Sequence, residues 1–260
     1  MKIIGIVSCP IPSPQPNKPE SYIYQNYLNW IQLSGMNFRI IPYNVAPPVL
    51  DRMLASVSGM VWCGGCIEDR KTHTDRQYHD LVRTYSHSFQ YAVRENDEGR
   101  PFPIWGSCLG FLFLAMLAEG IDHAFFSHIQ HAFKHSSAPV VFTGRSRLRS
   151  VFPKSVQEWM AHTPVAYHIH QYGFKEDSPH TARLKKFLRV VSYDTTKEGR
   201  IVNMYEFLHY PFYGSQWHPE QPKNEGALEV SRRLSEFLKA QCTDRPPPPL
   251  ERVVPSVLIN

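Results

Sequence analysis

Short apolar runs alternate with amphipathic segments along most of the chain. Runs typical of buried strands cover residues 2–7, 38–44, 59–65 and 101–106. Apolar residues at helical spacing cover residues 22–33, 51–56, 78–94 and 107–119, and again 225–240 near the end. Because strands that alternate with helices form parallel sheets covered on both faces, this order predicts an α/β fold with a mostly parallel central sheet.

The second half of the chain adds strands with fewer helices between them. Residues 139–144, 186–194, 201–207 and 212–218 have the character of strands, several with alternating apolar and polar positions. Closely spaced strands favour antiparallel pairing, so we expect some antiparallel strands at one edge of the sheet. We predict a three-layer α/β sandwich, flavodoxin-like in its layering, as a single domain over residues 1–242, followed by a Pro-rich tail over 243–260.

Composition narrows the class of protein. With 42% hydrophobic and 20% charged residues, the chain is of the globular type rather than disordered or fibrous. Its longest apolar run, residues 111–117, is far shorter than the roughly 18 residues of a membrane span. The apolar run at its start is too short for a signal peptide, and five cysteines do not suggest a disulfide scaffold. We therefore expect a cytoplasmic protein that needs no membrane. A net charge of +5 is too small to indicate nucleic acid.

The string GSCLG at residues 106–110 is the strongest candidate for chemistry. It lies between a predicted strand and a predicted apolar helix, and Gly-x-Cys-x-Gly in that place is the thiol counterpart of the Gly-x-Ser-x-Gly nucleophile elbow. Glycines on both sides permit a turn tight enough to strain the central residue. Cys108 would then stand at a helix N-terminus, where the partial positive charge favours the thiolate. The alternative is a small buried cysteine in a Gly-rich turn.

The string QWHPE at residues 216–220 supplies a candidate base. His218 ends a predicted strand, Pro219 stops the ladder, and Glu220 lies two residues further on. A thiolate needs an acid–base partner, and that imidazole needs an acceptor on its second ring nitrogen. Cys108, His218 and Glu220 therefore form a candidate nucleophile, base and orienting group.

Together, GSCLGF and YGSQWHPE resemble the class I glutamine-amidotransferase-like hydrolases and, within them, the gamma-glutamyl hydrolases. Weaker similarity to this family extends from residue 1 to about residue 240. The resemblance implies a cysteine hydrolase that cleaves γ-glutamyl amides, most naturally folylpoly-γ-glutamates, through a thioester. It implies an anionic small-molecule substrate carrying a poly-γ-glutamyl chain, and no metal or organic cofactor. Relatives are often lysosomal, vacuolar or secreted, and a homodimer is one option for the assembly.

The resemblance also assigns roles to further residues. Backbone N–H groups of Gly65 and Leu109 would form the oxyanion hole, while His170 and Tyr22 would bind substrate. Two positions depart from the family pattern. Leu112 stands where relatives commonly carry a carboxylate. The glycine loop is framed by cysteines, as CGGC over residues 63–66, instead of reading Pro-Gly-Gly-Ser.

Other strings allow competing interpretations. Cys63 and Cys66 form a C-x-x-C after a strand, as in a thiol–disulfide oxidoreductase. A histidine-rich stretch contains His123, His128, His131 and His135. The last three could share a helix face and bind a divalent metal, although a solvated face is the commoner meaning of such a run. Alternating arginines on an extended segment could attract a polyanion; these are Arg145, Arg147 and Arg149.

Two alternatives share the elbow itself. A glutaminase subunit that delivers ammonia to a separate synthetase would need the same nucleophile, base and glycine loop. A catalytically impaired binding protein could keep the fold, and the apolar Leu112 leaves that interpretation open.

Overall fold

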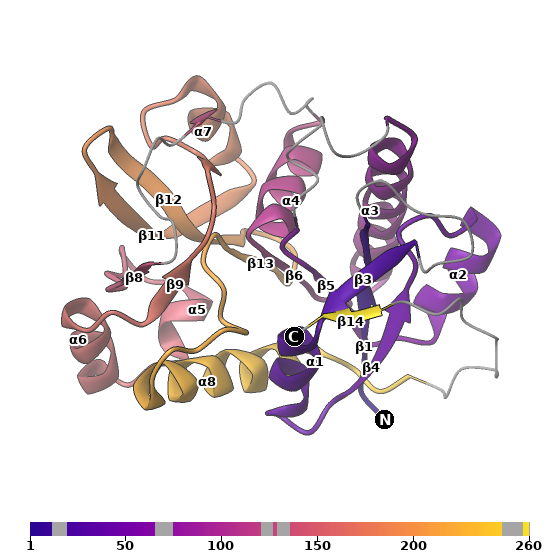
Figure 1. Cartoon of the computed structure of the whole chain (residues 1–260), viewed down its shortest axis with the longest axis horizontal. Coiled ribbons are helices and arrows are strands. Elements are labelled where there is room, and N and C mark those ends of the chain that lie inside the picture. The colour runs from indigo at the N-terminus through magenta and orange to yellow at the C-terminus, as the bar shows by residue number, and fades with distance from the viewer. Residues whose placement is uncertain (12–19, 66–74, 121–126, 129–135, 246–256, 260) are drawn as a thin grey trace.

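A seven-stranded sheet forms the centre of the molecule, in the order β11-β12-β13-β6-β5-β1-β4 (Figure 1). The computed structural model describes residues 1–11, 20–65, 75–120, 127–128, 136–245 and 257–259. Five neighbouring strands run parallel: β4 (Asn37–Ile41), β1 (Ile3–Val7), β5 (Gly59–Trp62), β6 (Ile104–Ser107) and β13 (Phe212–Ser215). Towards one edge, β12 (Gly199–Phe207) pairs antiparallel with β13, and the edge strand β11 (Leu188–Thr196) pairs antiparallel with β12. The predicted α/β fold with an antiparallel edge is confirmed.

Helices cover both faces of this sheet because the parallel strands bury both sets of side chains. On one face lie α2 (Pro47–Ala55), α3 (Asp75–Asp97) and α4 (Leu109–Glu119), and on the other lie α1 (Gln25–Gln32) and α8 (Glu225–Gln241). In β1 the alternation is visible, since Ile3 belongs to the first core and Ile4 to the second. The three-layer arrangement follows directly from this pattern.

Local chemistry explains where the long helices begin and end. Helix α8 begins after Asn224, whose side-chain oxygen accepts a hydrogen bond from the N–H of Ala227. Helix α4 ends at Gly120, which adopts a left-handed conformation with φ of 67°. Along the part of the chain that the structure describes, no helix combines the length and the apolar character needed to cross a bilayer.

The first predicted helix begins later than its apolar spacing indicates. Residues Ser21–Tyr24 form strand β3, and the helix α1 covers only Gln25–Gln32. Tyr22 therefore lies in a strand, paired antiparallel with Cys9 of β2 (Cys9–Pro10). The C-terminal strand β14 (Val257–Ile259) pairs parallel with β3 on its other side. These long-range pairings override the local helical pattern.

The predicted strand at 139–144 and the extended arginine segment after it are wrong. Phe142 makes only an isolated bridge to Ser192. Residues Arg147–Ser150 then form the short helix α5, whose N-cap Ser146 accepts a hydrogen bond from the N–H of Arg149. Because these residues are helical, the three arginines do not line one side of a strand.

Several short elements lie outside the central sheet. They include α6 (Lys154–His162), α7 (Pro179–Leu184) and two antiparallel pairs, β8 (Ser136–Ala138) with β9 (Ala166–His168) and β10 (Tyr172–Gly173) with β7 (Ser127–His128). The turn after β9 reaches the elbow, because the carbonyl of Ile169 lies 3.9 Å from Sγ of Cys108.

Candidate active site

Cys108 occupies the sharp turn between β6 and α4. Its φ of 50° and ψ of −106° make it the one non-glycine residue with positive φ among those the structure describes. Such strain costs of order 1–3 kcal/mol and concentrates at functional sites. The flanking glycines make the turn possible. A Cβ on Gly106 would lie 2.6 Å from the carbonyl oxygen of Gly110, and a Cβ on Gly110 would lie 2.1 Å from that of Trp62.

Neighbouring parallel strands bring the nucleophile and the base to the same edge of the sheet. β6 and β13 are in register, with Ser107 opposite Ser215. The N–H of Cys108 donates to the carbonyl of Ser215 at 2.9 Å, which ties the elbow to the strand that leads to His218. The carboxyl ends of adjacent parallel strands are where sites in such sheets are built.

His218 is held by Glu220 and faces Cys108. Nδ1 of His218 lies 2.5 Å from Oε1 of Glu220, and the two side chains are 6% and 3% exposed. A Cβ on Gly64 would lie 2.8 Å from Cε1 of His218 and 3.1 Å from Cβ of Cys108, so this glycine leaves room where the two side chains meet.

The charge of His218 follows from its partners. Burial lowers its pKa, but the negative charges of the Glu220 carboxylate and the Cys108 thiolate outweigh burial and raise that pKa to about 10. A protonated imidazole beside Cys108 favours the thiolate form of the sulfur. The structure thus brings together the three residues predicted as nucleophile, base and orienting group.

The glycine loop after β5 packs against the elbow. The N–H of Gly110 donates to the carbonyl of Cys63 at 3.2 Å, and a Cβ on Gly65 would lie 3.7 Å from Cδ2 of Leu109. Gly65 and Leu109, the residues predicted for the oxyanion hole, are therefore neighbours beside Cys108. Their role in binding an oxyanion stays a prediction.

Two residues that hydrogen bond to this loop were not singled out from the sequence. The hydroxyl oxygen of Tyr27 in α1 accepts a 2.6 Å hydrogen bond from the N–H of Gly64, and the thiol of Cys9 donates to the Gly64 carbonyl at 3.4 Å. Tyr27 is fully buried, and its helical spacing predicted only a core residue. A buried tyrosine hydroxyl requires a hydrogen-bond partner, but the sequence alone does not identify which one.

His170 interacts with the base, whereas Tyr22 lies in the strand β3. The nearby His218 contributes to lowering the pKa of His170, after the larger effect of burial. Tyr22 is 3% exposed and stacks edge-on against Tyr24 at 5.2 Å. Its strand is linked to the site through Cys9, which bonds to the glycine loop. Substrate binding by His170 and Tyr22 stays a prediction.

The structure describes Leu112 and Cys63, two of the three residues that depart from the family pattern. Leu112 is buried in the core one turn after the nucleophile, and its N–H donates to the Cys108 carbonyl at 3.1 Å. Cys63 is also buried, and burial, with Cys9 nearby, raises the pKa of its thiol well above the usual value. A thiol with a raised pKa is a poor nucleophile, which disfavours the oxidoreductase interpretation. Cys66 lies outside the described residues.

The structure describes only some of the remaining candidate residues. His123, His131 and His135 lie outside the described residues, and His128 lies in β7. Within the described ranges, no group of three or more His, Cys, Asp or Glu side chains is arranged to hold a metal ion. Arg147 donates to the carbonyls of Phe207 and Tyr210, so it has partners within the fold.

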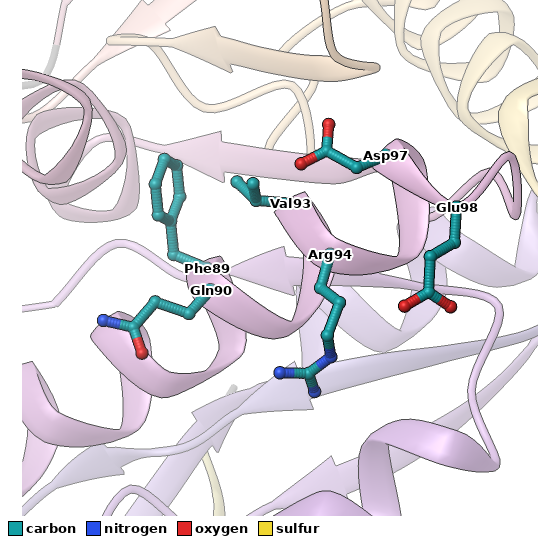
Figure 2. Close-up of a pocket in the computed structure, with 6 residues that line it drawn as sticks. All are labelled: Phe89, Gln90, Val93, Arg94, Asp97 and Glu98. Atoms are coloured by element: carbon teal, nitrogen blue, oxygen red, sulfur yellow. The ribbon is translucent and has the colours of Figure 1, made fainter.

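A pocket of about 340 Å³ lies along α3, at the other end of the sheet (Figure 2). Its apolar wall includes Phe89, whose ring packs 5.6 Å from that of Phe212 at the start of β13. Phe212 pairs with Ile104 at the start of β6, whereas Cys108 follows the end of that strand. The pocket is therefore separate from the elbow.

Comparison with known proteins shows which proteins this chain resembles. The chain is 26% identical over 235 residues to a gamma-glutamyl hydrolase of Mus musculus, covering 85% of this chain and 71% of that protein. It is 24% identical to a gamma-glutamyl hydrolase of Homo sapiens, covering 78% of this chain and 62% of the human protein, so it spans less than two thirds of that relative.

A solved structure shows the same fold at low sequence identity. A chain in the structure of PurLQS from Thermotoga maritima superposes with a TM-score of 0.58 at 12% identity, covering 92% of this chain and 98% of that one. The family model described as Peptidase C26 matches residues 2–220, most of the chain. The chain belongs to the Peptidase C26 family.

Proposed function

We propose that this protein is a cysteine hydrolase that cleaves γ-glutamyl amide bonds, with folylpoly-γ-glutamates as the preferred substrates. One observation carries the proposal: Cys108 sits in a strained elbow against His218, and Glu220 lies 2.5 Å from the far side of that imidazole. Relatives named gamma-glutamyl hydrolase supply the substrate class.

The first half of the reaction forms a thioester. The Cys108 thiolate attacks the γ-carbonyl carbon, and the carbonyl electron pair moves to oxygen, where the N–H groups of Gly65 and Leu109 stabilise the negative charge. As the C–N bond breaks, the His218 imidazolium gives its proton to the departing amine nitrogen. The γ-glutamyl group is then bound to sulfur and His218 is neutral.

The second half releases the acyl group. Neutral His218 takes a proton from water, and the resulting hydroxide attacks the thioester carbonyl carbon. The C–S bond breaks and the sulfur leaves as thiolate beside the His218 imidazolium, while the new γ-carboxyl group loses its proton to solvent. Glu220 keeps the imidazole ring oriented and stabilises its charged form, as an orienting carboxylate does in other triads.

Chromatography of pteroylpentaglutamate after incubation with the protein tests the substrate class. We expect shorter pteroylglutamates and free glutamate or glutamyl peptides, with no such products from the Cys108→Ala variant. Free glutamine serves as the competing substrate. Release of ammonia from glutamine with no shortening of the polyglutamate chain would contradict the proposal and favour the glutaminase-subunit alternative.

A further inference from the structure

A carboxyl group and two imidazoles form a buried chain beside the catalytic base. Asp194 lies in β11, His168 ends β9, and His170 follows two residues later. His168 is fully buried, while Asp194 and His170 are 6% and 5% exposed. The outer ring, His170, is close enough to His218 for the charge of His218 to lower the pKa of His170, after the larger effect of burial. We call this group the Asp194–His168–His170 chain.

The hydrogen bonds of the chain determine which nitrogen carries each proton. Nδ1 of His170 lies 3.1 Å from the carbonyl oxygen of Tyr172, which can only accept, so Nδ1 carries the hydrogen. Burial and the nearby His218 lower the pKa of His170 to about 3, so the ring is neutral and its Nε2 has a lone pair. Nδ1 of His168 lies 3.0 Å from that Nε2 and must therefore donate to it.

The same reasoning reaches Asp194. Burial, followed by His170 and His218, lowers the pKa of His168 well below its usual value, so this ring is neutral too. With its hydrogen on Nδ1, Nε2 of His168 has a lone pair that faces Oδ2 of Asp194 at 3.6 Å. That distance is within ion-pair range and longer than a good hydrogen bond. Two lone pairs facing each other in a buried place repel unless a proton lies between them.

The carboxyl group is where that proton is best placed. Oδ1 of Asp194 already accepts a 3.0 Å hydrogen bond from Nδ2 of Asn203, which leaves Oδ2 to carry the hydrogen towards His168. Burial raises the pKa of Asp194 to about 7, so the neutral acid is substantially populated at neutral pH. Among the described residues, Asn203 meets the chain at its inner end and His218 acts on it at its outer end.

We propose that Asp194 acts as a protonated acid that donates to Nε2 of His168 and so sets the tautomers of both His168 and His170 beside the catalytic base. Asp194 and His168 are positioning residues in this scheme, since neither touches Cys108. The inference rests on the proposed hydrolase function of the Cys108–His218 site. Ionisation of Asp194 would place a carboxylate against the His168 lone pair and force that ring to rotate or to take a proton, which disturbs His170.

The Asp194→Asn variant tests the proposal directly. Its amide can donate to His168 through nitrogen and accept from Asn203 through oxygen, and it stays neutral at every pH. We expect kcat/KM within about twofold of the wild type at pH 6, and a ratio of variant to wild type that rises about fivefold or more by pH 8. The Asp194→Leu variant, which has no donor, should lose about tenfold or more at both pH values.

A control variant at Asp51 and an NMR titration of the Asp194 carboxyl group complete the test. Asp51 also contacts a histidine, with Oδ1 2.7 Å from Nε2 of His87 on the surface, so Asp51→Asn should leave the pH profile unchanged. Carboxyl carbon NMR on aspartate-labelled protein should show one group titrating near pH 7 that disappears in Asp194→Asn. Thermal unfolding identifies any variant that fails to fold, and the NMR titration of the wild type decides the proposal in that case.

Three results would overturn the proposal. They are a loss above tenfold at pH 6 in a folded Asp194→Asn protein, equal activity of the Asn and Leu variants, or an Asp194 carboxyl that stays ionised down to pH 5. If the wild type cleaves no γ-glutamyl substrate, the proposed function fails, whereas the carboxyl titration still answers the question about Asp194.

Discussion

Two buried histidine regions lie next to each other, and they differ in charge. His218 has a carboxylate 2.5 Å from Nδ1, and its pKa is raised to about 10. His170 has an imidazole and a backbone carbonyl as partners, and its pKa is lowered to about 3. Both side chains are only 5–6% exposed. Burial therefore does not decide the charge of a histidine; the chemistry of its partners does.

The difference suits the division of labour in the proposed reaction. The ring that transfers protons must be charged when the thiolate attacks and neutral when water attacks. The rings beside it must not compete for that proton, and neutral His168 and His170 do not. Removal of the anionic partners of His218 should thus lower its pKa towards that of His170.

Removal of the sulfur should have the largest effect. The Cys108→Ala variant should lose about 10⁴-fold or more in kcat, because no other group can form the acyl intermediate. Since Cys108 also raises the pKa of His218, that pKa should fall in the variant while Glu220 keeps it above the value of His170. Steady-state kinetics and histidine NMR measure the two effects. Cys242→Ala is the control, since this buried thiol is at the end of α8.

Removal of the carboxylate should come next. The Glu220→Gln variant should lose about 10²–10⁴-fold in kcat/KM, as when an orienting carboxylate is neutralised in a triad. Without the anion, burial dominates, so the pKa of His218 should fall towards that of His170. A His218 pKa unchanged in the folded variant would show that Glu220 does not maintain the charge. Glu229→Gln on the exposed face of α8 is the control.

The Glu220→Gln variant should also differ from the wild type in how its stability depends on pH. The folded-state pKa of His218 is raised from 6.5 to about 10, so its protonation stabilises the fold fully below about pH 6.5 and that contribution is lost as pH rises through 10. The difference in unfolding free energy between wild type and Glu220→Gln should therefore shrink from pH 6 to pH 10. Denaturant unfolding at several pH values measures it, and a difference that grows with pH would contradict the assignment.

The cysteines should differ in their rate of alkylation, by a smaller factor than the losses of activity above. Iodoacetamide should label Cys108 about tenfold faster or more than Cys63 or Cys242, because burial raises the pKa of the Cys63 thiol and raises that of Cys242 to about 12. Peptide mapping after timed quenching gives the three rates. Faster labelling of Cys63 would instead revive the thiol–disulfide interpretation.

The smallest effect is expected from the hydroxyl that holds the glycine loop. Tyr27→Phe removes the acceptor of the Gly64 N–H, and we expect a loss of about 1–3 kcal/mol in stability. Activity should fall several-fold as the loop beside His218 loosens. Tyr210→Phe is the matched control, because its hydroxyl bonds to Asp97 on the surface near the remote pocket. Equal effects of the two substitutions would show that the loop does not depend on Tyr27.

The site was predictable from the sequence where local constraints determine geometry. The turn at Cys108 requires Gly106 to lie against the backbone of Gly110, and Gly110 to lie against the backbone of Trp62. Because only glycine fits at both positions, the turn has a recognisable sequence motif. His218 and Glu220 are likewise only two residues apart, so one short string contains both. The strands β11 and β12 were also predictable, because alternating apolar and polar positions are a local feature of the sequence.

What could not be predicted depends on contacts between distant segments. Tyr22 is in a strand because Cys9 pairs with it, although its local spacing is helical. The contact between His168 and Asp194 joins β9 and β11, and the sequence predicted Asp194 only as a residue of the strand at 186–194. The segment from Arg145 to Arg149 alternates in sequence, yet a cap at Ser146 makes it helical. Periodicity describes one element at a time and cannot reveal such partners.

Trapping of the acyl-enzyme tests the central claim most directly. The protein is mixed with pteroylpentaglutamate, quenched with acid within the first turnover and analysed by peptide-mapping mass spectrometry. We expect a γ-glutamyl or pteroylglutamyl thioester on the peptide that contains Cys108, in larger amount with a folded Glu220→Gln variant if it slows deacylation. Substrate cleavage with no adduct on Cys108, or with an adduct on another residue, would contradict the account.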